Sequence, residues 1–374
     1  MIDPIKFINS LKKNSINFFT GVPDSLFASL CKEFEDKEKN NHIISTNEGS
    51  AVGLAIGYHL ATGKIPLVYL QNSGLGNIIN PLVSLADKNI FNIPIFLLIG
   101  WRGEILNKKK QIKDEPQHKT QGLITEKLLK VLNIKYKILY HKSNFKNEVF
   151  YLKKFALQKK KIVALLVKKN TFKNINSQIQ SKNIKKIFRE DALKEVFKQI
   201  PSNFPKISTT GMLSRELNEL NEKNNFTKNT FMCVGGMGHA ISIATGIAFC
   251  KKKKIFCFDG DGSSLMHLGA QANSSKLKNI VHILFNNYAH DSVGGQKPPS
   301  ENITFNKLAK KMGYGFTYRV NNLILLKNII KKSLKNKKST FIEIICEAGH
   351  RKELTRPGKP PLFYKKQFMK FLKN

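Results

Sequence analysis

The most informative stretch of this sequence is Ile255-Phe256-Cys257-Phe258-Asp259-Gly260-Asp261-Gly262-Ser263. Its apolar start predicts a buried strand, and a helical pattern follows the glycines. A second apolar run, Ile280 to Phe285, leads into Asn286-Asn287. Because the carboxyl ends of adjacent parallel strands meet at one edge of a sheet, we expect the two polar loops to form a ligand site.

The side chains of these loops suit a metal and a phosphate group. Asp261 offers a carboxylate oxygen and Asn287 an amide oxygen, which are ligands that Mg²⁺ accepts. Gly260 and Gly262 allow close approach of the backbone to a diphosphate, and the amides at Ser263 favour an anion. A lone Gly-Asp-Gly is more often a tight turn, but the flanking strands and the paired asparagines favour the binding site.

The rest of the chain indicates an α/β protein made of two doubly wound parallel sheets. Glu48 to Thr62 is the clearest helical pattern of the first half. Ten apolar runs are candidate strands: His42 to Thr46, Pro66 to Leu70, Pro94 to Gly100, Lys135 to Tyr140 and Ile162 to Val167 in the first half, and Lys206 to Thr210, Thr230 to Val234, Ile255 to Phe258, Ile280 to Phe285 and Thr340 to Cys346 in the second.

The length of 374 residues suits two domains. Lys168 to Lys186 is polar and rich in Asn, Lys, Gln and Ser, which is typical of a linker. We therefore expect a first domain over residues 1–168, a linker over 169–187 and a second domain over 188–374. No internal repeat is visible beyond the α/β rhythm that the two halves share.

The chain is strongly basic, with 63 Lys and Arg against 26 Asp and Glu and a formal charge of +37. The lysines are scattered with Asn and Ile, and no nucleic-acid motif or aromatic platform accompanies them. We therefore expect neither nucleic acid nor membrane as a partner. A non-catalytic basic binding protein on the same fold remains an alternative, and salt-sensitive binding to random DNA would support it.

The cysteines and the N-terminus predict a cytoplasmic protein. Five cysteines form an odd number without C-x-x-C spacing, and most sit in apolar segments, as is typical of reduced core thiols. The N-terminus lacks a basic region followed by an apolar stretch, and no apolar run reaches membrane-spanning length.

The segment from Gly260-Asp261-Gly262 to Asn286-Asn287 resembles the thiamine-diphosphate signature of decarboxylases and acetolactate synthases. The resemblance implies thiamine diphosphate and Mg²⁺ as cofactors, bound by a pyrimidine-binding first domain and a diphosphate-binding second domain. It assigns the metal to Asp261, the Asn287 side chain and the Ala289 carbonyl, together with two diphosphate oxygens. Mn²⁺ would suit the same oxygen-rich site.

Two more parts of the cofactor site follow from the resemblance. Glu48, in Asn47-Glu48-Gly49, takes the place of the carboxylate that binds the pyrimidine nitrogen N1′ in such enzymes. Without the resemblance, it reads as an acid that stabilises the first turn of a helix. Gly236, Met237 and Gly238 resemble the loop whose large apolar residue supports the bent cofactor, although Met237 would also suit a gap in the core.

The compact form, with no central third domain, resembles the phosphonopyruvate and sulfopyruvate decarboxylases. The resemblance covers about residues 4 to 132 and 188 to 373, and the chain departs from it at Gly236, where serine is common, and at Tyr288, where a smaller residue is usual. Matching segments are Gly21 to Ser25, Gln71 to Asn77 with Gly74, Trp101 to Gly103, Asp114 to His118, Asn287 to Gln296 and Gly349 to Pro357.

The implied reaction is decarboxylation of 3-phosphonopyruvate to phosphonoacetaldehyde and CO₂, in phosphonate biosynthesis, with sulfopyruvate as the alternative substrate. Cationic and donor groups in these loops are candidates for the anionic head group, or else solvated surface groups: Ser25, Arg102, His118, Arg351 and Arg356. Asp24, His118 and His290 are candidates for proton transfer or substrate orientation. The resemblance also implies a homodimer or homotetramer in which Glu48 of one subunit faces the diphosphate site of another.

Overall fold

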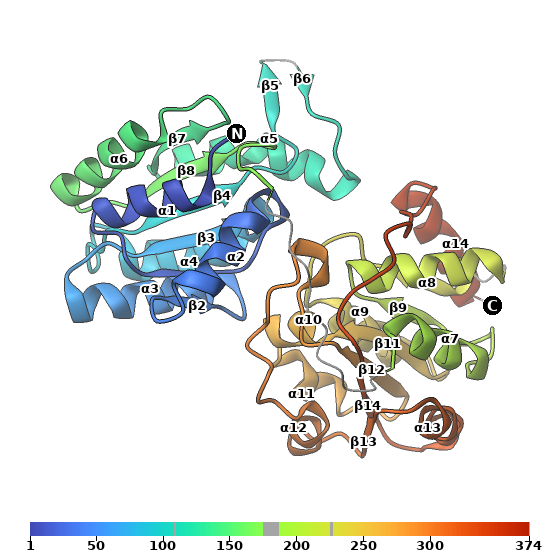
Figure 1. Cartoon of the computed structure of the whole chain (residues 1–374). Helices are drawn as coiled ribbons and strands as arrows, with labels where there is room; N and C mark the ends of the chain where they lie inside the picture. Colours follow the sequence, from blue (N-terminus) through green and yellow to red (C-terminus); the bar gives the residue numbers. More distant parts are fainter. Residues whose placement is uncertain (108–109, 175–186, 225–226, 374) are drawn as a thin grey trace. The chain divides into compact units, whose positions relative to one another are not determined.

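The computed structural model describes residues 1–107, 110–174, 187–224 and 227–373. These residues fold into two compact units, one within Met1–Gln178 and one within Ile179–Asn374 (Figure 1). Most of the predicted linker, residues 175–186, lies outside the described residues. Its described start belongs to unit 1, because Thr171 and Phe172 are buried and the Ile2 amide donates to the Thr171 carbonyl at 2.7 Å.

Unit 1 is a parallel six-stranded sheet with helices on both faces. One face packs against α1, α2 and α6 through an apolar cluster that includes Phe7 and Phe34. The other packs against α3, α4 and α5 through Val52 and Ile78. The strands are β1 (Phe19–Gly21), β2 (His42–Ile44), β3 (Leu67–Gln71), β4 (Phe96–Gly100), β7 (Lys135–Leu139) and β8 (Val163–Val167), and the helices are α1 (Pro4–Lys13), α2 (Ala28–Lys37), α3 (Glu48–Thr62), α4 (Leu75–Pro81), α5 (Pro116–Val131) and α6 (Phe145–Lys159).

Unit 2 repeats this architecture. Helices α7, α8 and α13 cover one face of its parallel sheet, and α9, α12 and α14 contribute to the cluster on the other. The strands are β9 (Lys206–Ser208), β10 (Thr230–Met232), β11 (Ile255–Gly260), β12 (Ile280–Asn286), β13 (Phe316–Val320) and β14 (Thr340–Ile345), and the helices are α7 (Arg189–Gln199), α8 (Met212–Lys223), α9 (Ala240–Cys250), α10 (Asp261–Met266), α11 (Ala270–Ser274), α12 (Phe305–Lys311), α13 (Leu323–Lys335) and α14 (Pro361–Lys373).

The two sheets have equivalent strand orders, β2-β1-β3-β4-β8-β7 and β10-β9-β11-β12-β14-β13. In each, the chain first adds a strand on one side and then returns to build the other side. Ligands of such sheets bind outside the carboxyl ends of the strands, where the direction of winding reverses. The predicted α/β fold with two doubly wound parallel sheets is therefore confirmed, and its topology locates a binding edge on each unit.

All ten predicted strands are present, most of them a residue or two shorter than expected. The predicted helix Glu48 to Thr62 matches α3: the Asn47 side chain accepts from the Ser50 amide at 2.8 Å, and Gly63, with φ of 67°, ends the helix. The sequence reasoning missed β1, β13 and the short antiparallel pair β5 (Ile105–Asn107) and β6 (Lys110–Gln111).

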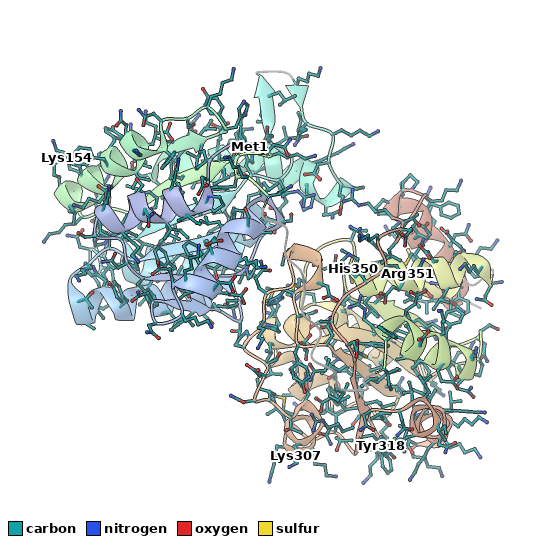
Figure 2. The ribbon with its side chains drawn as sticks, in the orientation of Figure 1. Met1, Lys154, Lys307, Tyr318, His350 and Arg351 are labelled. Carbon is teal, nitrogen blue, oxygen red and sulfur yellow. The ribbon has the colours of Figure 1, made fainter. Side chains whose placement is uncertain are left out.

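Exposed lysines lie on the surface of both units, and four of the five cysteines follow the predicted pattern of core thiols. Lys154 on α6 and Lys307 on α12 are exposed, as the side chains in Figure 2 show. Four cysteines are buried free thiols, whereas Cys250 is exposed because α9 ends there. Within the described residues, no helix has both the length and the apolar character needed to cross a membrane.

Candidate active site

The predicted site residues of unit 1 follow the carboxyl ends of four neighbouring strands. Asp24 and Ser25 follow β1, Glu48 follows β2 and begins α3, Gly74 follows β3, and Arg102 follows β4. His118 is buried in the first turn of α5. Since the strands are parallel, their carboxyl ends share one edge of the sheet.

Glu48 is held in one orientation by two neighbours. Its side chain is buried, and the Asn77 amide donates to Oε2 at 2.7 Å. A Cβ atom at Gly74 would lie 2.3 Å from Oε1, so only glycine leaves room for this carboxylate. Gly74, which was predicted to bind the cofactor, thus packs against Glu48, which was predicted to bind the pyrimidine nitrogen.

Asp24 is buried at the same edge. Its Oδ1 accepts from the Leu26 amide at 2.5 Å, while Oδ2 makes no hydrogen bond to any residue that the structure describes. Burial raises the pKa of Asp24 above its usual value, although the hydrogen bond from Leu26 opposes the change. A buried acceptor without a partner, on a carboxyl group with a raised pKa, is typical of a functional site.

Arg102 lies beside this carboxyl group and is already paired. Its Nε and Nη2 donate to Asp114 at 2.8 and 2.5 Å, and Nη1 donates to the Ser25 hydroxyl at 3.3 Å. Burial tends to raise the pKa of Asp114, but the hydrogen bonds from Arg102 hold that pKa well below its usual range. The structure therefore joins Ser25 and Arg102 in one cluster that carries a fixed cation and a fixed anion.

The predicted metal ligands of unit 2 follow two paired strands. Asp261 follows β11 and Asn287 follows β12, and Gly260 is the strand partner of Phe285, so the two strands end within one residue of each other. Both are buried, and Asp261 Oδ2 accepts from the Ser300 hydroxyl at 2.9 Å. Burial raises the pKa of Asp261 to about 7, against the hydrogen bond from Ser300.

A glycine-rich loop between β10 and α9 meets this strand end. Gly236 and Gly238 have φ angles of 64° and 89°, which favour glycine. The Gly238 amide donates to the Ser263 hydroxyl at 3.1 Å, and Thr209 bonds the same hydroxyl at 2.8 Å. Ser263, predicted to bind the cofactor, therefore fastens this loop to α10.

Met237 and His290 converge on Gly262. A Cβ atom at Gly262 would lie 3.5 Å from Met237 Cε and 2.6 Å from His290 Cε1. The Nε2 atom of His290 is buried, with no hydrogen-bond partner among the described residues, and burial lowers the pKa of His290 to about 4. At Gly260, in contrast, a Cβ atom would meet nothing within 4 Å, so the turn is open on that side.

The two predicted arginines of the tail lie on the surface. Arg351 donates to Glu190 and Glu219, each at 2.6 Å, and Arg356 is exposed. The Arg351 guanidinium is therefore already engaged by two carboxylates. Sequence reasoning assigned no role to Asn77, Asp291 or Ser300, which touch predicted site residues. Asn77 and Asp291 lie inside segments that carry the resemblance, and Ser300 gave no signal.

The chain belongs to the thiamine pyrophosphate enzyme family. The N-terminal TPP binding domain of that family matches residues 6–123, and the C-terminal TPP binding domain matches residues 206–344. One matched region therefore contains Glu48 and the other contains Asp261 and Asn287. The first matched region lies within unit 1 and the second lies within unit 2.

Three relatives extend over nearly the whole chain. The phosphonopyruvate decarboxylase of Streptomyces viridochromogenes is 27% identical over 100% of this chain and 95% of its own. That of Streptomyces hygroscopicus is 27% identical over 99% of this chain and 94% of its own. The sulfopyruvate decarboxylase of Methanosarcina acetivorans is 26% identical over 95% of this chain and 94% of its own.

Proposed function

We propose that this protein is a thiamine-diphosphate-dependent carboxy-lyase that converts 3-phosphonopyruvate to phosphonoacetaldehyde and CO₂. The observation that carries the proposal is the fixed carboxylate of Glu48, held by Asn77 and Gly74 in a family match that includes Asp261 and Asn287. The full-length similarity to two phosphonopyruvate decarboxylases supports the choice of substrate.

The residues at the end of β11 fit a diphosphate held through a divalent cation. Asp261 is a buried carboxyl group whose pKa is raised by burial, and a Cβ atom at the neighbouring Gly260 would meet nothing within 4 Å. Asp261, the Asn287 amide oxygen and the Ala289 carbonyl would hold Mg²⁺. In the described part of the chain, no group of three or more His, Cys, Asp or Glu side chains is arranged to hold a metal ion.

In this proposal, the cofactor would supply a cationic ring that takes up the electron pair left on the substrate carbon when CO₂ departs. Glu48 holds a proton at the pyrimidine nitrogen N1′, and Met237 supports the cofactor from the loop before α9. The product aldehyde needs one proton in place of the carboxylate. Asp24, His118 and His290 are the candidate donors, since all three have buried side-chain atoms at the site edges.

The head group of the substrate is an anion, and the Ser25–Arg102 cluster is the candidate that receives it. A phosphonate would compete with Asp114 for the guanidinium, and the Ser25 hydroxyl would add a donor. Arg351 and Arg356 remain further candidates; a phosphonate would compete with two glutamates for Arg351 but with one aspartate for Arg102.

A second candidate function is sulfopyruvate decarboxylation, which the similarity to the Methanosarcina enzyme favours. CO₂ release from phosphonopyruvate, sulfopyruvate and pyruvate, measured with thiamine diphosphate and Mg²⁺, separates the two. We expect the highest kcat/KM with phosphonopyruvate. A preference for sulfopyruvate would keep the mechanism and replace the substrate, whereas turnover of none of the three would contradict the proposal.

The proposal includes a homodimer or homotetramer with shared active sites. Helix α3, which begins with Glu48, leaves Leu54 and Leu60 exposed, and nothing lies within 4 Å of a Cβ atom at Gly53 or Gly57. Helix α9 likewise exposes Phe249. The exposed apolar side chains on these two helices support an interface that includes them.

The same proposal places the enzyme in the cytoplasm, with neither nucleic acid nor membrane as partner. Cys31, Cys233, Cys257 and Cys346 are free and buried, which suits a reducing compartment. Retention of random DNA at physiological salt would count against the absence of a nucleic-acid partner, because scattered surface lysines alone bind DNA weakly at that ionic strength.

A further inference from the structure

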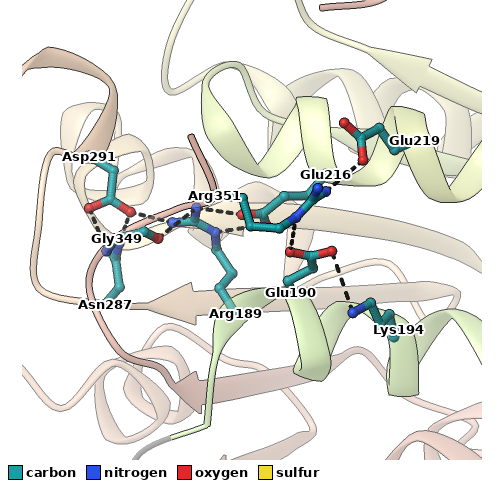
Figure 3. Close-up of polar contacts among 9 residues, drawn as sticks. All are labelled: Arg189, Glu190, Lys194, Glu216, Glu219, Asn287, Asp291, Gly349 and Arg351. Atoms are coloured by element: carbon teal, nitrogen blue, oxygen red, sulfur yellow. Dashed lines mark hydrogen bonds and ion pairs between the residues drawn. The ribbon is translucent and has the colours of Figure 1, made fainter. Parts of the chain in front are cut away.

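A buried chain of charged side chains in unit 2 ends on the proposed metal ligand Asn287 (Figure 3). Arg189 and Glu216 are both buried, and the guanidinium donates from Nε and Nη2 to the two oxygens of Glu216 at 2.9 and 2.8 Å. The remaining nitrogen, Nη1, donates to Asp291 Oδ2 at 2.6 Å. One arginine therefore links two carboxylates from different parts of the unit.

Asp291 receives hydrogen bonds on both oxygens. The Asn287 Nδ2 group donates to Oδ2 at 2.7 Å beside the bond from Arg189, and the Gly349 amide donates to Oδ1 at 3.1 Å. An ionised carboxylate accepts at both oxygens, whereas an amide would turn a donor toward one of these donors. The position therefore requires an acid for a geometric reason.

The contact with Asp291 fixes which way the Asn287 amide faces. Asparagine has one donor atom and one acceptor atom, so donation from Nδ2 turns Oδ1 away from Asp291. The Ala289 amide lies 3.4 Å from that oxygen, within the same turn. We infer that Arg189 and Asp291 are positioning residues that hold Asn287 with its oxygen available to a divalent cation. This inference rests on the proposed function.

A role in positioning explains this network better than a role in stability alone. Replacing buried ion pairs with apolar groups is often neutral for stability, whereas groups that orient metal ligands have a large effect on metal affinity. The neighbouring residue gives a natural comparison. Asn286 donates to the buried Glu343 at 2.9 Å in the same manner, but Asn286 is not a proposed ligand.

The test is the Mg²⁺ concentration that gives half-maximal binding of thiamine diphosphate, measured by calorimetry or near-ultraviolet circular dichroism. We expect Asp291→Asn to raise this concentration about 10-fold to 100-fold. Glu343→Gln, the matched control, removes a carboxylate that holds the neighbouring asparagine and should leave the Mg²⁺ requirement unchanged. The Tm of each protein without cofactor separates loss of positioning from loss of folding.

Arg189→Lys is the second variant, in case Asp291→Asn does not fold. Lysine keeps the charge but lacks the planar fork that serves Glu216 and Asp291 together, so a smaller rise in the Mg²⁺ requirement is expected. Equal Mg²⁺ requirements in the wild type and the folded variants, whatever their Tm, would overturn the inference alone. A wild type that shows no Mg²⁺-dependent binding would instead overturn the proposed function and the inference with it.

Discussion

Glu48 depends on the absence of a side chain at Gly74. A Cβ atom there would meet Oε1 at 2.3 Å, and the polar neighbour Asn77 keeps the carboxylate from turning aside. Gly74→Ala should therefore displace Glu48 and lower kcat about 100-fold, as small displacements of catalytic groups do. Gly76→Ala is the matched control, because nothing lies within 4 Å of its Cβ position. Its kcat from steady-state kinetics and its Tm should both be close to those of the wild type.

The buried carboxyl group of Asp24 makes the stability of the folded protein depend on pH. Burial raises its pKa in the folded protein, so the folded state favours the protonated form and loses stability as pH rises above the usual value of 3.8. An amide at this position imitates the protonated carboxyl group. Asp24→Asn should therefore raise Tm at neutral pH, by about 2–4 °C for each kcal/mol released, and less below pH 4. If the Tm difference between Asp24→Asn and the wild type were the same at neutral pH and below pH 4, the raised pKa of Asp24 would be refuted.

Some site residues could be predicted from the sequence because their spacing carries the signal. Asp261 and Asn287 each follow an apolar run, and Glu48 begins a helical pattern. The contacts of Asn77, Asp291 and Ser300 carry no such signal, because they join positions whose proximity depends on side-chain packing. Contact between Gly74 and Glu48 is likewise visible only in three dimensions.

The elements that sequence reasoning missed are those with the weakest apolar pattern. Strand β1 has only three residues and ends in Gly21, so it is too short to show alternation. Edge strand β13 carries Thr317 and Arg319 and is only partly buried over most of its length. The long central strands β4, β8, β11 and β12 are apolar and buried on both faces, which explains why they could be predicted.

Helix α3 provides the prediction at the scale of an element. In the proposed function, its exposed apolar residues belong to a subunit interface. Leu54→Lys should convert the oligomer to monomer and abolish activity together, as measured by sedimentation velocity and CO₂ release. Ile324→Lys on α13 places the same charge on another exposed apolar position and should leave both unchanged. A fully active monomer would rule out shared active sites.

At the scale of the whole molecule, the proposed function divides the chemistry between the two units. The equivalent strand orders give each unit one binding edge, with Glu48 on the first and the loop of Asp261 and Asn287 on the second. In the proposed function, the carboxylate that faces the pyrimidine lies in the first unit and the metal ligands lie in the second. The proposed activity therefore requires both halves of the chain, which agrees with relatives that are similar over almost the full length.

The most direct test of the account is CO₂ release from phosphonopyruvate by the purified protein, with and without thiamine diphosphate, in the wild type and in Glu48→Gln. We predict release that depends on the cofactor and falls about 100-fold to 10,000-fold in the variant, since glutamine cannot hold the proton at N1′. Release without thiamine diphosphate, or equal release by Glu48→Gln with the cofactor bound, would contradict the account.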